Sequence, residues 1–255
     1  MKNLFVFLLL SVTYLANAQE TDWSKKDWKK PETTEFYDIK PKFITPAATA
    51  GDAPSDAKIL FNGKDMDSWV MAKDKAPSKW KLGNGAMTIV KESGDLATKE
   101  KFGDCQLHVE FMIPANSKNE AYYGNAGNSG IFLQERYELQ IFDSYKDEVP
   151  LYSNGQCGSI YKQAIPMANA CSKPGEWNSF DVMYTAPIFR PNGTVEKPAY
   201  ITVLHNGIFI LNHFEIQGTI ECIGIPRYEP HGKSSLVIQG HGSEVSFRNI
   251  WIREL

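Results

Sequence analysis

The sequence predicts an all-β protein in which two antiparallel sheets pack face to face. After Ala57, short runs of β-branched and aromatic residues recur and are separated by Gly, Pro and Asn, a pattern typical of antiparallel strands and turns. No long segment repeats apolar residues at i, i+3 and i+4, so helix bundles and parallel α/β sheets are disfavoured. A single flat sheet of so many strands would expose an apolar face, whereas a sandwich buries it.

The expected strands follow one another at short intervals. Asn206-Gly207 lies between two of them and indicates a type I′ hairpin turn, because both central residues of that turn need positive φ. In chain order the predicted strands are 58–61, 86–90, 106–113, 130–133, 137–142, 179–184, 200–204, 208–213, 235–238 and 245–252.

Residues 1–18 are typical of a secretory signal peptide. Lys2 precedes an apolar run that begins at Leu4, and Ala16-Asn17-Ala18 provides the small residues that a signal peptidase recognises. The apolar run is too short to span a bilayer, and no later segment is apolar enough to do so. We therefore expect an exported protein, periplasmic or secreted, without a membrane span.

Residues 19–56 are predicted to form an extended N-terminal arm that precedes one domain at 57–255. The arm is rich in Lys, Asp, Thr, Pro and Ala and shows little periodicity. Its aromatic residues either pin it to the domain or belong to a plain linker. These residues are Trp23, Trp28, Phe36 and Tyr37.

Composition excludes several classes of function. The net charge of −3 is spread along the chain, so the basic surface that nucleic-acid binding requires is missing. Phosphate loops, dinucleotide-binding glycine motifs, Gly-x-Ser-x-Gly elbows and His-Glu-x-x-His pairs are absent, and no cofactor is expected.

The four cysteines suggest one or two disulfides in an exported chain, and three pairings are possible. Cys157 with Cys171 is the preferred pair because it closes a short loop. Cys105 and Cys222 complete the set, and no two cysteines have the close spacing of a zinc ribbon, so no metal site is expected.

Strand 137–142 is the most informative segment for function. Alternation places Glu138 and Gln140 on one face, with Tyr137, Leu139 and Ile141 on the other. A carboxylate and an amide above a rigid sheet suit a polyhydroxylated ligand. An ordinary solvated strand face has the same pattern and remains the alternative.

A second strand, 106–113, places His108 and Glu110 together on its polar face. If this face coincides with that of Glu138, the two glutamates form the carboxyl pair that glycosidic chemistry uses. His108 alone is more typical of packing. Trp177 follows a Pro-Gly turn and could stack on a sugar or belong to the core.

The sequence resembles the exported 3-keto-disaccharide hydrolase domain proteins from about Ala57 to Leu255. Seven blocks in the family's order carry the resemblance: Leu60-Phe-Asn-Gly-Lys-Asp-Met-Asp-Ser-Trp69, Asn128-Ser-Gly-Ile-Phe-Leu133, Tyr137-Glu-Leu-Gln-Ile-Phe-Asp-Ser-Tyr145, Gly158-Ser-Ile-Tyr161, Lys173-Pro-Gly-Glu-Trp-Asn178, Leu204-His-Asn-Gly207 and Phe247-Arg-Asn-Ile-Trp-Ile-Arg-Glu-Leu255. The resemblance implies a concanavalin A-like jelly-roll sandwich whose concave face binds sugar, and a substrate already oxidised to a ketone at C3.

With such a substrate, Glu138 is the expected base at C2, and Glu110 or His241 is the expected acid for the departing oxygen. The expected substrate-binding residues are Gln140, Asn128, Gln239, Trp177, His108 and Asp143; Asp143 could instead bind a cation or support its turn. A separate sugar 3-dehydrogenase is expected to make the ketone. A non-catalytic sugar-binding module and a conventional glycosidase are the alternatives.

Overall fold

The computed structural model describes residues 29–35, 39–117, 126–147 and 151–255. The predicted signal peptide and the arm residues Trp23, Trp28, Phe36 and Tyr37 lie outside these ranges. The chain divides into two units, Met1–Phe43 and Ile44–Leu255. In the first unit a 3₁₀ helix, η2, spans Pro31–Thr34 and has proline in its first turn, where the missing N–H costs nothing.

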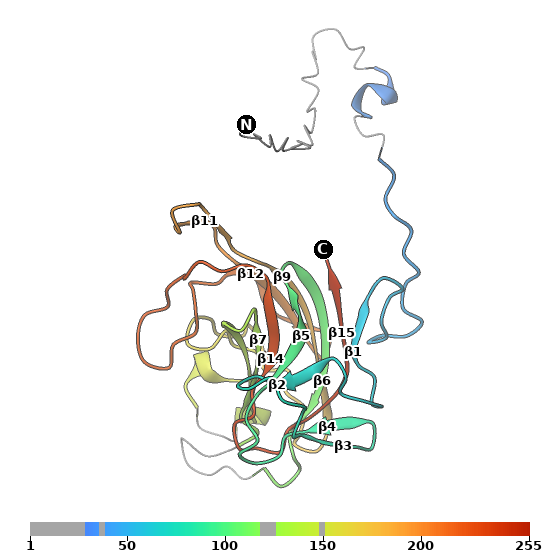
Figure 1. Ribbon diagram of the computed structural model, residues 1–255. Coiled ribbons are helices and arrows are strands. Elements are labelled where there is room, and N and C mark those ends of the chain that lie inside the picture. Colours follow the sequence, from blue (N-terminus) through green and yellow to red (C-terminus); the bar gives the residue numbers. More distant parts are fainter. Residues whose placement is uncertain (1–28, 36–38, 118–125, 148–150) are drawn as a thin grey trace, which may run out of the picture. The chain divides into compact units, whose positions relative to one another are not determined.

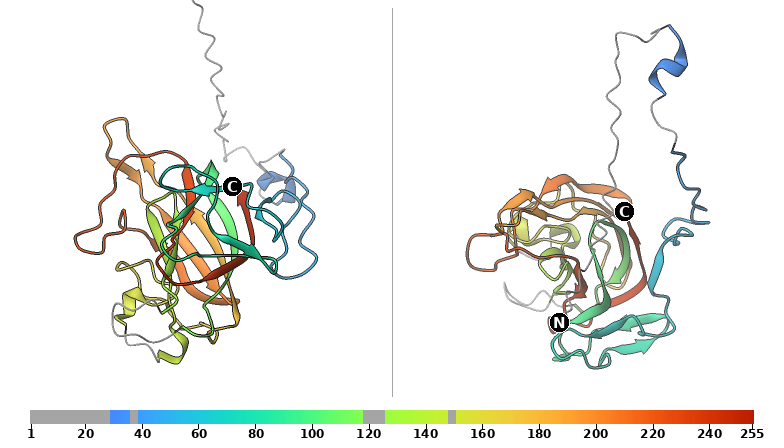
Figure 2. Two further views of the ribbon diagram at one scale, coloured as in Figure 1. Left: turned by 60° about the horizontal axis from the view of Figure 1, so that its bottom comes forward. Right: turned by 45° about the horizontal axis from the view of Figure 1, so that its top comes forward.

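The second unit is built from two main antiparallel sheets (Figures 1 and 2). The first sheet contains β1 (Lys58–Phe61), β3 (Lys81–Gly83), β4 (Ala86–Thr88), β6 (Cys105–Met112), β9 (Trp177–Thr185), β12 (Tyr200–His205), β13 (Ile208–Glu215) and β15 (Ser246–Glu254). Its order is β13-β12-β9-β6-β15-β4-β3, and β1 also pairs with β15.

The second sheet has five strands in the order β2-β5-β14-β7-β8. They are β2 (Trp69–Met71), β5 (Leu96–Phe102), β14 (Ser234–Ile238), β7 (Ser129–Leu133) and β8 (Tyr137–Ile141). A small hairpin, β10 (Ile188–Phe189) with β11 (Val195–Lys197), and two 3₁₀ turns, η3 (Tyr145–Asp147) and η4 (Ser153–Gly155), complete the unit.

The predicted fold class is confirmed as an all-β sandwich of two antiparallel sheets. The sequence also predicted the hairpin at Asn206-Gly207: both residues have positive φ and they join β12 to β13. Three strands of the sandwich, β2, β3 and β5, were not predicted. Within the described residues, no helix is long and apolar enough to cross a bilayer.

One hydrophobic core lies between the two sheets. Leu107, Val109 and Phe111 of β6 belong to the same buried cluster as Tyr137 and Ile141 of β8. Each large apolar side chain buried there contributes roughly 1.5–3 kcal/mol. Because alternate residues of a strand point to opposite faces, the polar side chains of β6 and β8 lie on the two outer faces of the sandwich.

Residues 44–57 belong to the second unit and pack on β15. The carbonyl of Gly51 accepts hydrogen bonds from Trp251 Nε1 at 2.8 Å and from Asn249 Nδ2 at 2.9 Å. Asp56 forms an ion pair with Arg253 at 2.7 Å. This part of the predicted arm is therefore fixed to the outer face of the larger sheet.

Candidate functional site

Glu138 and Gln140 of β8 lie on the outer face of the five-stranded sheet. Their neighbour β7 pairs with β8 so that Gly130 is directly opposite Gln140. A Cβ atom at position 130 would lie 2.4 Å from Glu138 Oε1, so the Glu138 carboxylate occupies the space that the missing side chain leaves. The glycine therefore leaves the room that the Glu138 side chain occupies on this face of the sheet.

Glu138 is only 5% exposed as a residue, and its carboxyl has no hydrogen-bond partner among the described residues. Burial, and then the negative charge of Asp95, raise its pKa to about 8. Asp95 is held beside β14, where its Oδ1 accepts a hydrogen bond from the Gly240 N–H at 2.9 Å. A buried carboxyl with a pKa near neutrality can take up and release a proton at physiological pH.

Two buried polar atoms near Glu138 lack partners in the described part of the chain: Gln140 Oε1 and Ser159 Oγ. Residues 158–161 run along the free edge of β8, with Gly158 N–H donating to the Gln140 carbonyl at 2.8 Å and Gln140 N–H donating to the Ser159 carbonyl at 3.0 Å. An unsatisfied buried polar group costs roughly 1–3 kcal/mol. Hydroxyl groups of a sugar would satisfy both atoms.

Asn128, Gln239 and His241 gather at the adjoining ends of β7 and β14. The Gln239 N–H donates to the Gly130 carbonyl at 2.9 Å, and Asn128 Nδ2 lies 3.2 Å from His241 Nδ1. The structure thus brings these three predicted residues to the same region of the sheet as Glu138 and Gln140.

Asp143 follows β8 and supports the loop that leaves the sheet. Its Oδ1 accepts a hydrogen bond from the Tyr145 N–H at 3.3 Å, and its Oδ2 accepts one from Ser117 Oγ at 3.4 Å. The side chain is 6% exposed. Of the three roles considered for Asp143, substrate binding, cation binding and support of its turn, these contacts favour support of the turn.

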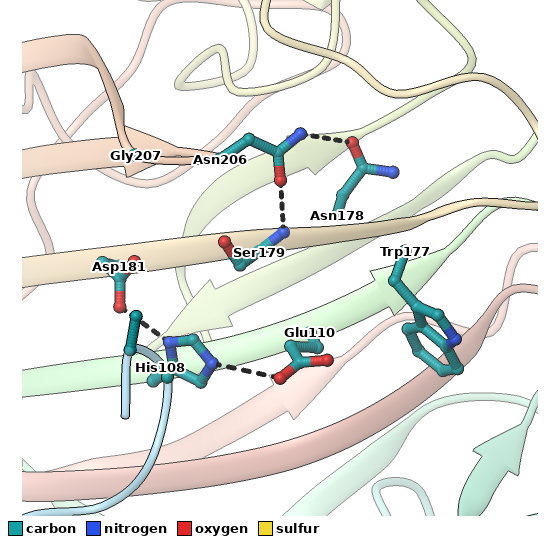
Figure 3. A pocket seen from close by; sticks show the side chains of 10 residues that line it. His108, Glu110, Trp177, Asn178, Ser179, Asp181, Asn206 and Gly207 are labelled. Carbon is teal, nitrogen blue, oxygen red and sulfur yellow. Dashed lines mark hydrogen bonds and ion pairs between the residues drawn. The ribbon is translucent and has the colours of Figure 1, made fainter. Parts of the chain in front are cut away.

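The other predicted residues, His108, Glu110 and Trp177, line a hollow of about 420 Å³ on the outer face of the larger sheet (Figure 3). The His108 imidazole lies between two carboxylates: its Nδ1 is 2.7 Å from Asp181 Oδ1 and its Nε2 is 3.7 Å from Glu110 Oε1. Glu110 and Glu138 therefore face opposite sides of the sandwich, and the two polar faces do not coincide.

Most polar groups of this hollow are already paired. Glu110 accepts hydrogen bonds from Asn249 at 2.8 Å and from Arg248, and the Arg248 guanidinium covers the Trp177 ring at 4.0 Å. Although burial alone would raise it, hydrogen bonds from Asn249 and Arg248 lower the pKa of Glu110. A carboxylate that is held ionised between such partners suits a structural role better than proton donation.

The amides of the hollow are satisfied as well. Asn206 accepts a hydrogen bond from the Ser179 N–H at 2.8 Å and donates to Asn178 Oδ1 at 3.1 Å (Figure 3). Asn178 Oδ1 also accepts from the Ser172 N–H at 2.8 Å. This network fixes the hairpin after β12 and leaves little free capacity for a ligand. Within the described ranges, no group of three or more His, Cys, Asp or Glu side chains is arranged to bind a metal ion.

Replacing Glu110 with glutamine should lower stability and leave catalysis almost unchanged. The ion pair with Arg248 stabilises the fold only while Glu110 is ionised, so we expect the Tm to fall by about 2–5 °C at pH 7. The difference should shrink as the pH falls through the lowered pKa of Glu110. Thermal melts from pH 3 to 7 measure this, and a turnover loss beyond tenfold would contradict a structural role.

Sequence reasoning missed three residues that help to build the site: Asp95, Gly130 and Ser159. Asp95 immediately precedes β5, which was not predicted. Gly130 was assigned to a strand, where a glycine can mark the close approach of another group. Ser159 lies outside every predicted strand, and only its pairing beside β8 reveals its position.

Comparison with known proteins identifies related chains. A model of the protein family described as 3-keto-alpha-glucoside-1,2-lyase-like domain matches residues 56–253. A crystal structure from Parabacteroides distasonis ATCC 8503, provisionally assigned as a glycosyl hydrolase, is 46% identical with a TM-score of 0.82 and covers 89% of this chain and 97% of its own. A second structure from that organism, with the same provisional assignment, is 23% identical with a TM-score of 0.57; it covers 78% of this chain and 94% of its own, and supports the fold alone. A search of curated proteins found no match.

Proposed function

Because this chain belongs to the 3-keto-alpha-glucoside-1,2-lyase-like domain family, we propose that it cleaves the glycosidic bond of 3-keto-glycosides or 3-keto-disaccharides. The family and the 46% identical relative support a carbohydrate-active function in general. The family's description as a 1,2-lyase favours elimination across C1 and C2. Hydration of the eliminated sugar then completes a net hydrolysis.

The C3 ketone makes this route chemically accessible. It acidifies the proton on C2, and the bond from C1 to the aglycone oxygen lies β to the enolate that forms. The base removes the C2 proton, the C1–O bond breaks with its electron pair on oxygen, and the aglycone leaves as an alcohol after taking a proton. Water then adds its hydroxyl to C1 and a proton to C2, which regenerates a 3-keto sugar.

Glu138 is the residue that we assign as the base. The observation that carries this assignment is its buried carboxyl, which has no hydrogen-bond partner in the described chain and a pKa raised to about 8. A base with a pKa near the working pH combines a useful ionised fraction with a strong affinity for the substrate proton. The space over Gly130 accommodates the carboxylate, so the glycine determines where the base can sit relative to the substrate.

His241 is the better of the two predicted acids, because Glu110 lies on the other face of the sandwich. His241 is exposed and lies beside Asn128 at 3.2 Å, where β7 begins, and β7 pairs with the strand that carries Glu138. Gln140 and Ser159, whose buried oxygens are free in the described structure, are proposed to bind substrate hydroxyls. Asn128 and Gln239 would hold the enolate oxygen.

A conventional glycosidase is the second candidate, and one observation favours it. Asp95 is close enough to Glu138 for its charge to raise the pKa of Glu138, so the site contains a pair of carboxyl groups. Such a pair also serves glycosidases that act through an oxocarbenium-like transition state. That mechanism has no need of a ketone at C3, which separates the two candidates experimentally.

The pH dependence of kcat/KM should report the raised pKa of Glu138. The base acts in its ionised form, so activity should rise about tenfold per pH unit below pH 8 and level off above it. Initial rates at low substrate concentration between pH 5 and 10 measure this profile. Activity that stays level across this range, as expected for a base with the ordinary glutamate pKa of 4.5, would argue against Glu138 as the base.

Hydrogen exchange at C2 tests the elimination itself. When the reaction runs in deuterium oxide, hydration of the C1–C2 double bond should place deuterium on C2 of the released 3-keto sugar, and mass spectrometry or NMR detects it. A blank with the product alone corrects for spontaneous enolisation. Product that forms at full rate without deuterium at C2 beyond the blank would contradict the proposal.

The site of action and the source of the substrate are also proposals. The predicted signal peptide at residues 1–18 supports export to the periplasm or beyond. An exported enzyme has no nicotinamide pool to draw on, so we propose that a separate sugar 3-dehydrogenase supplies the ketone. The dehydrogenase can supply this substrate without binding to this protein.

A further inference from the structure

Two of the four cysteines meet at the end of β8, beside the candidate site. Cys157 and Cys171 are 3% and 9% exposed and carry free thiols in this structure, and each thiol is close enough to shift the pKa of the other. The Cys171 Sγ lies 3.9 Å from the carbonyl oxygen of Phe142, the residue after β8, and the backbone of Phe142 also contacts the Cys157 thiol. The two sulfur atoms are therefore neighbours within the folded chain.

The backbone on both sides of the pair is anchored to the same residue. The Cys157 N–H donates to Ser144 Oγ at 2.9 Å, and the Asn169 amide donates to the Ser144 carbonyl. Asn169 Oδ1 in turn accepts a hydrogen bond from the Cys171 N–H at 3.1 Å. These bonds hold the two chain segments side by side, which is an arrangement that a disulfide between them requires.

We propose that Cys157 and Cys171 form a disulfide in the mature protein and that this disulfide fixes residues 157–171 against β8. The two thiols lose two protons and two electrons as the S–S bond forms. A disulfide-bearing exchange partner accepts the electrons and is reduced to its dithiol. The proposal uses the oxidising compartment that the predicted signal peptide implies.

The other two cysteines have different surroundings and are assigned as free thiols. Cys105 is buried in β6, where burial and then the charge of Asp104 raise the pKa of its thiol to about 12. Cys222 is exposed and lies 3.8 Å from the Tyr161 hydroxyl. Neither thiol has a contact with Cys157 or Cys171 in the described structure.

Residues 157–171, which the proposed disulfide would close into a loop, carry part of the candidate site. Ser159 and Tyr161 lie within it, and its backbone pairs with β8 at Gln140 and at Glu138, where the Tyr161 N–H donates to the Glu138 carbonyl at 3.3 Å. A disulfide at the two ends of this segment would hold Ser159 in position beside Gln140. This consequence for catalysis rests on the proposed function, whereas the disulfide itself does not.

Thiol counting and peptide mapping test the disulfide without any activity assay. Protein isolated from an oxidising compartment and denatured without reductant should show two reactive thiols of the four cysteines, and four after reduction. Proteolysis should give a cross-linked pair of peptides that contain Cys157 and Cys171, lighter by two hydrogen atoms than the sum of the reduced pair. Four thiols before reduction, or a cross-link to Cys105 or Cys222, would overturn the proposal.

Stability measurements test the role of the disulfide. Wild-type protein should lose about 5–10 °C of Tm on reduction, because the cross-link restricts the unfolded chain. The double variant Cys157→Ala/Cys171→Ala should melt at the lower temperature with or without reductant, and Cys222→Ala should behave like wild type. An equal Tm for oxidised and reduced wild type would show that the cross-link does not restrain the fold.

A kinetic comparison separates the disulfide from the proposed function. At 25 °C, reduced and still folded wild type should show a KM raised severalfold, with a smaller change in kcat, because Ser159 binds substrate and Glu138 performs the chemistry. A cross-link found together with an inactive wild-type enzyme would reject the proposed function and keep the disulfide. An active enzyme with four free thiols would reject the disulfide and keep the proposed function.

Discussion

Replacing Glu138 with glutamine is expected to reduce kcat by about 10³-fold or more, because the variant keeps the shape of the side chain but has no carboxylate to accept the C2 proton. Substrate binding should persist, since the hydroxyl contacts proposed for Gln140 and Ser159 remain. Single-turnover kinetics with a 3-keto glucoside and calorimetric titration of the same ligand measure the two quantities separately.

Stability gives this variant an internal control. Glu138 has a folded-state pKa near 8 against an ordinary value of 4.5, so its neutral form stabilises the fold and that contribution is lost as the pH rises from about 4.5 through 8. The glutamine variant avoids the loss, and its Tm relative to wild type should rise by several degrees over that range. The exposed Glu176→Gln is the charge-matched variant and should change neither activity nor this pH dependence. Retained turnover in Glu138→Gln would dismiss Glu138 as the base.

Replacing Gly130 with alanine should reduce kcat by roughly 10–100-fold through displacement of Glu138. The new methyl group would lie 2.4 Å from Glu138 Oε1 and 2.9 Å from its Cγ, so the carboxylate must move. A shift of about 1 Å in a catalytic group can cost about 10²-fold in rate. Steady-state kinetics give the loss, and a crystal structure of the variant shows where the carboxylate has gone.

Gly83→Ala provides the matched control for this substitution. Gly83 lies in β3, and a Cβ atom there meets nothing within 4 Å. The control should keep full activity, which would show that a glycine-to-alanine change in a strand does not by itself impair the enzyme. Wild-type kinetics in Gly130→Ala would mean that the position of the Glu138 carboxylate does not matter for turnover.

The sequence alone predicts which side chains of a strand point into the core, because this alternation depends only on neighbouring residues. Tyr137, Leu139 and Ile141 are buried in the core as the alternation on β8 requires, and Glu138 and Gln140 lie on the outer face. β5 was missed because its second half reads Lys99-Glu100-Lys101 and is exposed, which hides the apolar pattern of its buried half.

The position of one strand relative to another could not be predicted in the same way. Glu110 and Glu138 each lie on the face of their strand that the alternation predicts. However, β6 and β8 belong to different sheets, and their polar faces point away from each other. Likewise, Ser159 reaches Gln140 only through long-range pairing of residues 158–161 with β8. Such contacts depend on the sheet topology, which a single strand does not encode.

The central claim is that cleavage depends on the ketone at C3, and a direct comparison of two substrates tests it. The same purified protein is given a 3-keto glucoside and the corresponding unoxidised glucoside with the same aglycone, and aglycone release is followed for both. We predict turnover of the 3-keto glucoside and none of the unoxidised glucoside within detection. Equal cleavage of both would point to a conventional glycosidase. Binding without cleavage of either by the folded protein would contradict the enzymatic assignment and leave a sugar-binding module.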